Sequence, residues 1–523
     1  MWLVTRRRVL SRLTAVPALT LIAAVISLAF LVAERRPAEA HHLCDATGSP
    51  LGPFNLETYE AQDYKNIYAR TMELAGFNQL LPDISSFAVP KLKTGDRTAG
   101  GDLTADAYIP PVLLKAIAWI ESGWAQASYD PLVDYGEVGP VLVSHDCGYG
   151  IMQVTSGMQN ISGVPNLDQA MIGGHYAFNV ARGAEILAGK WNMSPDYRPV
   201  VGARDFQIIE NWYYALWGYN GFAFKNHPLN PAYSSTRAAF SCGPDTDGLG
   251  HDRSQYPYQE LVLGCAANPP VRTGTPLWPA QEVHLPDLSN PAFAGPLKLE
   301  NWAPCSQDFQ CAPMDIPTPN TNHKDPTTLT VDRAQVLGAP ALDISQNEFA
   351  LTRDATAGEL TISNTGTGVL SWRATASAPW VRLSPQGGVA LGPDLGDRAS
   401  TLTITVDTAA LGTGAGAATV TIESLFAAGV PAAVAVSMAA GPTPTGPAPT
   451  PAPTPTPTPR CPGNLDSVQA LHILRYVANL ETCAQPSDDV NCDGQVDALD
   501  ALAILRHTAA LPAGVPAGCL PLG

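Results

Sequence analysis

Glu121 is the residue whose type and position in this sequence best fit proton-transfer chemistry. Leu114, Ile117 and Glu121 fall on one face of a predicted helix, so a carboxylate ends a stripe of aliphatic side chains. Burial on such a face disfavours the charged carboxylate and raises its pKa toward neutral pH, as a general acid requires. We therefore predict that Glu121 exchanges a proton with a substrate. The alternative is a solvated or salt-bridged glutamate at the end of a helix.

The helix that carries Glu121 has clear ends in the sequence. Pro111 suits its first turn, where a missing backbone N–H leaves no helical hydrogen bond unmade, and Gly123 suits its end. The loop that follows, residues 128–147, is long enough to have a function of its own. Its charged or titratable side chains are Asp130, Asp134, Glu137, His145 and Asp146. They either solvate an exposed loop, or one of them supplies a second carboxylate to the same cleft.

Four short motifs follow one another between residues 109 and 224. In order they are Glu121-Ser122-Gly123, Gly150-Ile151-Met152-Gln153, Asn179-Val180-Ala181-Arg182-Gly183-Ala184-Glu185-Ile186-Leu187 and Gly218-Tyr219-Asn220-Gly221. This stretch resembles the soluble lytic transglycosylase family. The resemblance implies a lysozyme-like α-helical fold and an enzyme that cleaves the glycan strands of peptidoglycan between N-acetylmuramic acid and N-acetylglucosamine.

The resemblance also implies roles for individual residues. Glu121 would be the single catalytic acid/base, and no cofactor is needed for catalysis. The expected substrate contacts are Ser122, Gly150, Met152, Gln153, Tyr219 and Asn220. Trp217 and Phe222 flank the last motif, where the family usually has small residues, so we expect a bulkier cleft wall and an altered substrate preference.

The number of carboxyl groups decides between two reactions at the same bond. A hydrolysing glycosidase usually needs two, one to protonate the leaving oxygen and one to act as nucleophile or to activate water. In the family that this stretch resembles, one glutamate protonates the glycosidic oxygen and then removes the C6 hydroxyl proton, which closes a 1,6-anhydro ring. The motifs place one acid, Glu121, so the sequence favours this lyase reaction. A lysozyme-type hydrolase and a non-catalytic wall-binding or scaffold protein are the alternatives.

The charge balance excludes one class of partner. The chain has 47 Asp and Glu against 30 Lys and Arg, a formal net charge of −17, whereas binding to nucleic acid needs clustered basic side chains. We expect contacts with carbohydrate to rest on aromatic stacking and hydrogen bonds. A dense aromatic cluster either packs in the core or stacks on sugar rings. Its members are Trp212, Tyr213, Tyr214, Trp217 and Tyr219.

Residues 1–40 are typical of a signal peptide or an N-terminal anchor. Arg6, Arg7 and Arg8 form a basic start, residues 13–33 form an apolar run, and Ala38-Glu39-Ala40 fits a cleavage site. We therefore expect a secreted or cell-envelope protein that lies outside the cytoplasm.

All ten cysteines lie beyond that segment, and an even number in an exported chain predicts disulfides. The expected local pairs are Cys242–Cys265 and Cys305–Cys311, and the cysteines expected to pair within the C-terminal module are Cys461, Cys483, Cys492 and Cys519. A zinc site is the weaker interpretation, because no CxxC pair accompanies the scattered histidines.

Composition and periodicity predict a multidomain chain. The expected parts after the signal are a lysozyme-like α-helical domain with an N-terminal extension (41–270), a Pro-rich disulfide-tied connector (271–339), an immunoglobulin-like β-sandwich (340–440), a Pro/Thr linker (441–460) and a small α-helical, EF-hand or dockerin-like domain (461–523). Helical patterns are expected at residues 56–74, 111–123, 175–191, 206–217 and 256–264.

The β-rich segment has a resemblance of its own. Alternating runs predict strands near residues 359–364, 369–374, 401–406 and 418–424. Asn364-Thr365-Gly366, Leu370-Ser371-Trp372 and Pro379-Trp380-Val381 resemble the BACON family of β-sandwich domains. Trp372 and Trp380 either bind glycan or belong to the core of a spacer domain.

The C-terminal segment contains an EF-hand-type loop for one Ca²⁺. Its expected ligands are Asp489, Asn491, Asp493, Gln495, Asp497 and Asp500, with Gly494 at the turn. The loop and the helix after it resemble a dockerin repeat. A partner repeat lies 31 residues earlier, where Gln469 stands in the place of Asp500, so only one cation is expected. The resemblance implies a cohesin-like partner or a cell-surface polysaccharide. The alternative is a calcium-stabilised terminal domain of another kind.

Overall fold

The structure, a computed structural model, describes the following residues: 56–96, 103–159, 164–193, 199–244, 252–291, 315–316, 332–441, 470–471, 473–474, 496 and 498–508. The chain divides into two compact units, Met1–Thr443 and Pro444–Gly523. The expected signal segment, the expected Cys305–Cys311 pair and residues 442–460 of the expected linker lie outside the described residues. Within the described ranges, no helix is long and apolar enough to cross a membrane.

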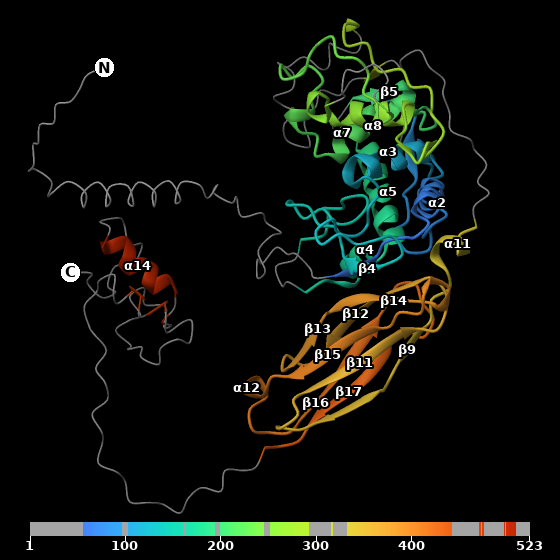
Figure 1. Ribbon diagram of the computed structural model, residues 1–523. Helices are drawn as coiled ribbons and strands as arrows, with labels where there is room; N and C mark the ends of the chain where they lie inside the picture. The colour runs from blue at the N-terminus through green and yellow to red at the C-terminus, as the bar shows by residue number, and fades with distance from the viewer. Residues whose placement is uncertain are drawn as a thin grey trace, which may run out of the picture. The chain divides into compact units, whose positions relative to one another are not determined.

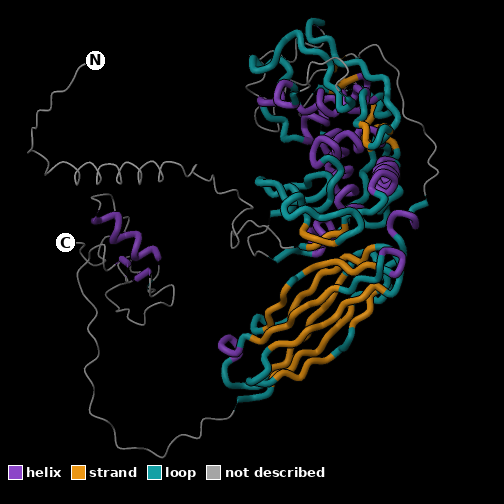
Figure 2. The backbone as a smooth tube through the Cα atoms, viewed as in Figure 1, coloured by secondary structure: helices purple, strands orange, loops and turns teal. Residues whose placement is uncertain are grey.

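The helical part of the first unit is shown in Figures 1 and 2. Its helices are α2 (Tyr64–Gly76), α3 (Pro111–Ser122), α4 (Leu167–Gly174), α5 (Tyr176–Asn192), α7 (Tyr213–Tyr219) and α8 (Tyr258–Ala267). The long helix α5 packs against α2, α4 and α7, while α3 packs against α2 and α8. These contacts bring the C-terminal end of α3 close to α8, although the two helices are far apart in the sequence.

Helix α3 has the ends that its sequence indicates. Pro111 occupies the first turn, and Gly123 ends the helix with a φ of 62°, in the left-handed region that glycine tolerates best. Leu114 and Ile117 are fully buried, as expected for one apolar face. The helix is buried almost along its whole length, and Glu121 in its last turn is only partly buried.

Two of the expected α-helices begin later in the structure than the sequence predicts. The segment expected to be helical from residue 56 begins as strand β1 (Glu57–Tyr59), which pairs antiparallel with β4 (Val138–Pro140), and its helix starts only at Tyr64. The long-range backbone pairing wins over local helical periodicity here. Likewise, the segment expected to be helical from residue 206 holds a 3-10 turn, η2 (Ile209–Trp212), before α7 begins.

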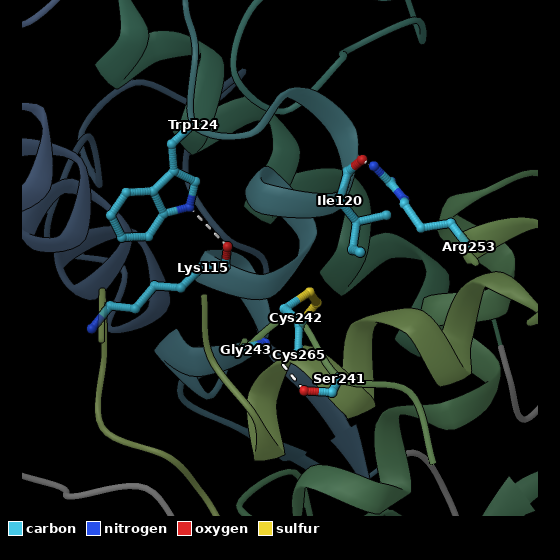
Figure 3. Close-up of a disulfide and its surroundings, with 8 residues drawn as sticks. All are labelled: Lys115, Ile120, Trp124, Ser241, Cys242, Gly243, Arg253 and Cys265. Carbon is cyan, nitrogen blue, oxygen red and sulfur yellow. Dashed lines mark hydrogen bonds between the residues drawn. A yellow bond between two sulfur atoms is a disulfide. The ribbon is translucent and has the colours of Figure 1, made fainter. Parts of the chain in front are cut away.

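Small strand pairs and one disulfide complete this part. The strand pairs are β2 (Leu92–Thr94) with β3 (Leu103–Ala105), β5 (Val200–Val201) with β8 (Asp315–Ile316), and β6 (Val271–Arg272) with β7 (Thr275–Pro276). The predicted Cys242–Cys265 disulfide is confirmed and ties the segment before α8 to that helix (Figure 3). Cys147 is also disulfide-bonded.

The β-rich part consists of two sheets that share one apolar core. The larger sheet has the order β10-β17-β16-β12-β14, and the smaller has the order β13-β15-β11-β9. The strands are β9 (Leu342–Ile344), β10 (Glu348–Leu351), β11 (Ala357–Asn364), β12 (Val369–Ala376), β13 (Val381–Ser384), β14 (Gly387–Leu391), β15 (Ser400–Val406), β16 (Gly416–Glu423) and β17 (Ala432–Met438). Trp372 is fully buried in the core and Trp380 packs at its edge, which supports the core interpretation of both.

The second unit is described only in part. Helix α14 (Ala498–Thr508) covers the helix expected after the calcium loop. Its buried side chains share a small cluster with residues of the earlier repeat: Ala470, Ile473, Ala501, Ala503 and Ile504. Asp500, in the first turn of α14, is fully buried.

Candidate active site

Glu121 lies in a cleft with a volume of about 520 Å³. The lining residues are Glu121, Ser144, His145, Asp146, Gln153, Val154, Thr155, Ser156, Ile186, Lys190, Tyr219, Asn220, Gly221 and Lys225. They come from the end of α3, the segment between residues 144 and 156, the last turns of α5, and the chain that follows α7. The cleft thus gathers three of the four sequence motifs and the tail of the motif carried by α5.

Burial controls the protonation of Glu121. Loss of hydration is the main cause that raises the pKa of this carboxyl, and the negative charge of Asp146 adds to it; the pKa that results from all the groups around Glu121 is about 7. Three groups act in the opposite direction: the hydroxyl of Tyr258, which donates a 2.5 Å hydrogen bond to Oε1, and the charges of Arg253 and Lys225. The carboxyl therefore exchanges its proton near neutral pH, as an acid/base residue must.

Two tyrosines flank the acid. The rings of Tyr219 and Tyr258 are nearly parallel, at 12°, with their centroids 6.5 Å apart. The hydroxyl of Tyr219 donates to the backbone carbonyl of Met152 at 2.9 Å, which joins α7 to the second motif. Burial raises the pKa of both phenols well above the ordinary value, so both remain hydrogen-bond donors at neutral pH.

The expected substrate contacts divide into two groups. Gln153, Tyr219 and Asn220 line the cleft, as a role in binding requires. Ser122, Gly150 and Met152 do not line the cleft, because their side chains or backbone are buried beneath it. These three residues support the cleft from beneath, and their contact with substrate stays a prediction.

The buried residues hold the turn that presents Gln153. The hydroxyl of Ser122 lies 2.8 Å from the carbonyl oxygen of Ile151, so the helix of Glu121 is tied directly to this turn. The backbone N–H of Met152 donates to Oδ1 of Asn179 at 2.8 Å. Gly150 has a φ of 65°, and a Cβ there would lie 2.5 Å from Oε1 of Gln126. Only glycine fits that position without displacing its neighbours.

Glu60 supports the same region from the N-terminal extension, a role for which no sequence motif provides a signal. Its carboxylate accepts hydrogen bonds from the backbone N–H groups of Gln126 and Ala127, both at 2.8 Å, and from the hydroxyl of Tyr68 at 2.7 Å. Gln126 in turn accepts from the N–H of Ile151 at 3.0 Å. The extension is therefore part of the framework that holds the cleft.

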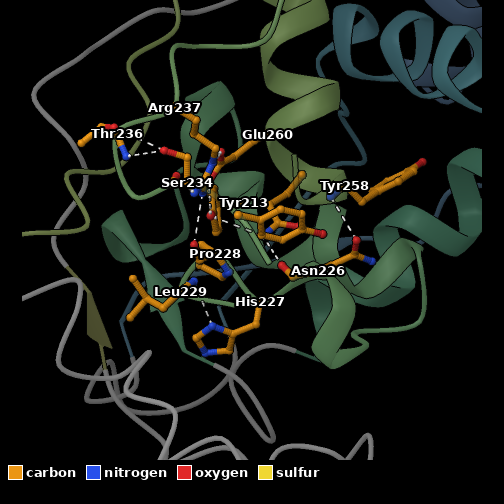
Figure 4. Close-up of polar contacts among 12 residues, drawn as sticks. Tyr213, Asn226, His227, Pro228, Leu229, Ser234, Thr236, Arg237, Tyr258 and Glu260 are labelled. Atoms are coloured by element: carbon orange, nitrogen blue, oxygen red, sulfur yellow. Dashed lines mark hydrogen bonds and ion pairs between the residues drawn. The ribbon is translucent and has the colours of Figure 1, made fainter. Parts of the chain in front are cut away.

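Tyr258 is the other residue that sequence reasoning missed. It belongs to α8, 137 residues after Glu121, and none of the four motifs includes it. Its backbone N–H donates to Oδ1 of Asn226 at 3.2 Å (Figure 4). Nδ2 of Asn226 in turn donates to Oδ1 of Asn220 at 2.8 Å. One asparagine thus fixes both the start of α8 and a side chain of the cleft.

The acidic loop contributes to the cleft only near its end. Of its titratable residues, His145 and Asp146 line the cleft, whereas Asp130, Asp134 and Glu137 are exposed and lie outside the lining. Oδ1 of Asp146 accepts a 2.5 Å hydrogen bond from the hydroxyl of Ser144. A second carboxylate is therefore present on the cleft wall, in an exposed position.

Most of the aromatic cluster belongs to the core. Trp212, Tyr213, Tyr214 and Trp217 are fully buried. Of the five residues, Tyr219 alone lines the cleft. The sugar-stacking interpretation is thus wrong for the other four. Trp217 contacts Phe222 with centroids 4.4 Å apart, so the bulk in the last motif fills the interior behind the cleft wall.

The expected metal ligands fall mostly outside the described residues. The residues that are not described include Asp489, Asn491, Asp493, Gln495 and Asp497. Within the described part of the chain, no group of three or more His, Cys, Asp and Glu side chains is placed to hold a metal ion. Asp500, the last of the expected ligands, is fully buried, and its binding to a cation stays a prediction.

Comparison with solved structures finds similarity over about one fifth of the chain. The Escherichia coli chaperone DraB is 11% identical, with a TM-score of 0.16, and the match covers 19% of this chain and 55% of that chain. The Pseudomonas aeruginosa CupB2 chaperone is 12% identical, with a TM-score of 0.16 and the same coverages of 19% and 55%. A Bacteroides ovatus GH5 xyloglucanase is 21% identical, with a TM-score of 0.14 and 19% of each chain covered.

The chain spans little more than half of the chaperones that it matches. Identities and TM-scores this low leave fold and function to be argued from the chain itself. No curated protein matches it. Residues 341–435 match a family model described as "Viral BACON domain". These residues span the strands from β9 into β17, so the expected BACON-like part is confirmed.

Proposed function

We propose that this protein is an exported peptidoglycan lytic transglycosylase that cleaves the β-1,4 bond between N-acetylmuramic acid and N-acetylglucosamine. The observation that carries the proposal is Glu121, an acid with a pKa of about 7 in a cleft that Gln153, Tyr219 and Asn220 also line. The resemblance of the four motifs to the soluble lytic transglycosylase family supports the same assignment.

In the proposed reaction Glu121 acts twice. The protonated carboxyl gives its proton to the glycosidic oxygen, and the bond from that oxygen to C1 of muramic acid breaks. The carboxylate then takes the proton of the C6 hydroxyl of the same sugar while O6 bonds to C1. A 1,6-anhydro end forms, no water is consumed, and Glu121 regains its proton. Tyr258, which donates to Oε1, stabilises the carboxylate between the two steps.

Clearing of purified cell walls tests the proposal. The wild-type chain should lower the turbidity of a wall suspension, and Glu121→Gln should reduce the rate at least about a hundredfold, because an amide has no proton to give. Glu137→Gln, which changes an exposed glutamate outside the cleft, should clear walls at the wild-type rate. Equal clearing by wild type and Glu121→Gln would remove Glu121 from the mechanism.

A lysozyme-type hydrolase is the second candidate, and the carboxylate of Asp146 on the cleft wall favours it. Hydrolysis needs a second carboxyl group, so Asp146→Asn should abolish it. The lyase reaction should survive this change. The mass of the released muropeptides separates the two outcomes directly, since the anhydro product is lighter than the hydrolysis product by one water.

A non-catalytic wall-binding or scaffold protein is the third candidate, and the match of residues 341–435 to a BACON family model is the reason to keep it. A binding protein would sediment with intact walls and release no muropeptides. Secretion or retention in the cell envelope belongs to all three candidates, and it rests on residues 1–40. N-terminal sequencing of the protein recovered outside the cytoplasm would show whether that segment is removed.

We also propose that the C-terminal unit binds one Ca²⁺ through the loop that ends at Asp500, and that it docks onto a cohesin-like domain or a cell-surface polysaccharide. The burial of Asp500 beside Ala501 and Ile504 supports the first part. Calorimetric titration of the full chain should give one calcium per chain, and Asp500→Asn should weaken binding. A stoichiometry of two calcium ions per chain would mean that the first repeat also binds a cation.

A further inference from the structure

Two lysines line the cleft of a strongly acidic chain. Lys190 comes from the last turn of α5, and Lys225 comes from the short 3-10 turn η3 (Phe224–Asn226). The formal net charge of the chain is −17, and we expected sugar contacts to rest on aromatic and neutral polar groups. Ammonium groups that two separate elements bring to the cleft of Glu121 indicate an anionic ligand, because hydrogen bonds between ions are stronger than those between neutral groups.

The backbone beneath Lys225 is held at both ends. Nδ2 of Asn226 donates to Oδ1 of Asn220 at 2.8 Å. The N–H of Tyr258 donates to Oδ1 of Asn226 (Figure 4). The hydroxyl of Tyr233 donates to the carbonyl oxygen of Lys225. The side chain of Lys225 is nevertheless exposed. An exposed ammonium group on a fixed turn can meet a ligand while the cleft wall keeps its shape.

The charge of Lys225 reaches the reacting centre. It acts on the ionisation of Glu121 together with Arg253 and opposes the effect of Asp146. Asp146 and Lys225 both line the cleft, so the cleft presents an anionic group and cationic groups to the same bound molecule. Such an arrangement favours a strand that carries negative charge on the side of the lysines.

We propose that Lys225, together with Lys190, binds a carboxylate carried by the glycan strand, so that the cleft selects acidic glycans over neutral ones. This inference rests on the proposed function, and it adds a specificity-determining role for residues outside the four motifs. In peptidoglycan the carboxylate has two sources, the lactyl group of muramic acid and the peptide stem. A lysine ammonium is a compact point charge that fits either source.

Binding to three defined glycan strands tests the inference without cleavage. The probes are peptide-bearing strands, strands freed of peptide so that the lactyl carboxylate is exposed, and the same peptide-free strands with each carboxylate converted to its methylamide. Isothermal titration uses the full chain with Glu121→Gln. The methylamide strand should bind roughly tenfold more weakly than the peptide-free acid strand, the ratio for one lost charged hydrogen bond.

Variants of the lysines complete the design. Lys225→Gln and Lys190→Gln are each combined with Glu121→Gln. Each should weaken binding of the acid strand but not of the methylamide strand, so the difference in affinity between the two strands should largely disappear. Lys91→Gln is the matched control, because Lys91 is exposed and lies outside the cleft, and it should leave the ratio unchanged. The tighter of the two acidic strands identifies the source of the carboxylate.

Several results would overturn the inference. One is equal affinity for the acid and methylamide strands, and another is no binding of any strand. The third is that Lys91→Gln changes the ratio of the two affinities as much as Lys225→Gln does. Failure of the proposed function appears elsewhere, as a wild-type protein that clears no walls. A protein can discriminate between the strands without cutting them, so the two failures are distinguishable.

Discussion

At the scale of single residues, a few named groups set the proton affinity of Glu121. Burial and the charge of Asp146 raise its pKa, the hydrogen bond from Tyr258 lowers it, and the net value is about 7. A general acid works only while it holds its proton, so cleavage should slow as the pH rises through that value. The alkaline limb of the rate profile should therefore report the pKa of Glu121.

Two substitutions should move that limb in opposite directions. Tyr258→Phe removes a hydrogen bond that favours the carboxylate, so the pKa of Glu121 should rise and the limb should move to higher pH. Asp146→Asn removes a negative charge, so the pKa should fall and the limb should move to lower pH. The measurement is kcat/KM on solubilised glycan strands across pH. A shift of both variants in one direction would contradict this account of the site.

Residue identity was easier to predict than residue orientation. The apolar stripe that ends in Glu121 and the position of Asn220 could be read from the sequence, and both residues line the cleft. Ser122 and Met152 lie next to cleft residues in the chain but are buried, because neighbouring residues of a helix or a turn point in different directions. Tyr258 could not be found, since only tertiary packing brings α8 to α3.

At the scale of elements, the turn at Gly150 should be the least tolerant part of the site. Gly150→Ala combines a strained φ of 65° with a Cβ 2.5 Å from Gln126 and 2.6 Å from Asn179, so it should destabilise the chain by more than about 3 kcal/mol.

Gly221→Ala is the matched control for that turn. Its φ is also positive, at 79°, but a Cβ there meets no atom within 4 Å, so strain alone should cost about 1 to 2 kcal/mol. Urea unfolding measures both changes. If both variants lose the same free energy of unfolding, the close approach of Gln126 and Asn179 to residue 150 does not contribute to the effect of Gly150→Ala.

Glu60 should prove to be a positioning residue. Glu60→Ala leaves the N–H groups of Gln126 and Ala127 without their acceptor and should lower the free energy of unfolding by roughly 2 to 4 kcal/mol. Glu60→Gln keeps one acceptor oxygen and should lose less. If the role is positioning, both variants should reduce kcat more than they raise KM while leaving the alkaline limb in place, and a moved limb would instead give Glu60 a part in proton transfer.

Strand β1, which ends at the residue before Glu60, shows where prediction from sequence stops. The helix of residues 111–122 could be placed because its proline, its glycine and its periodicity are all local signals. Strand β1 could not, because its partner β4 lies some eighty residues away and nothing in residues 57–59 records that pairing. The strands of the β-rich part were predictable, since each alternates over several residues and folds onto a sheet with one buried face.

At the scale of the whole molecule, the Cys242–Cys265 disulfide closes a loop with a sequence separation of 23. Replacing both cysteines with serine should lower the free energy of unfolding of the helical part by about 3 kcal/mol, because the unfolded chain regains the freedom of that loop. Thermal unfolding with and without a reducing agent gives the comparison. A wild-type protein whose melting temperature is unaffected by reduction would contradict the estimate.

Two boundaries lie close to positions where the composition of the sequence changes sharply. The match to the BACON family model begins at residue 341, close to the expected start at residue 340. The two-unit division falls at Thr443, near the expected start of the Pro/Thr linker. Packing inside the helical part could not be predicted in the same way, because it depends on contacts between distant segments.

The hydroxyl of Ser122 makes the spacing between the acid and the Gln153 turn independent of the chain that joins them. Helix α3 is tied to Ile151 directly, across a span of 29 residues, and the exposed tip at residues 130–132 takes no part in that tie. That tip is therefore a place where extra residues can be inserted, or a foreign peptide or tag displayed, with the alignment of the two cleft walls preserved.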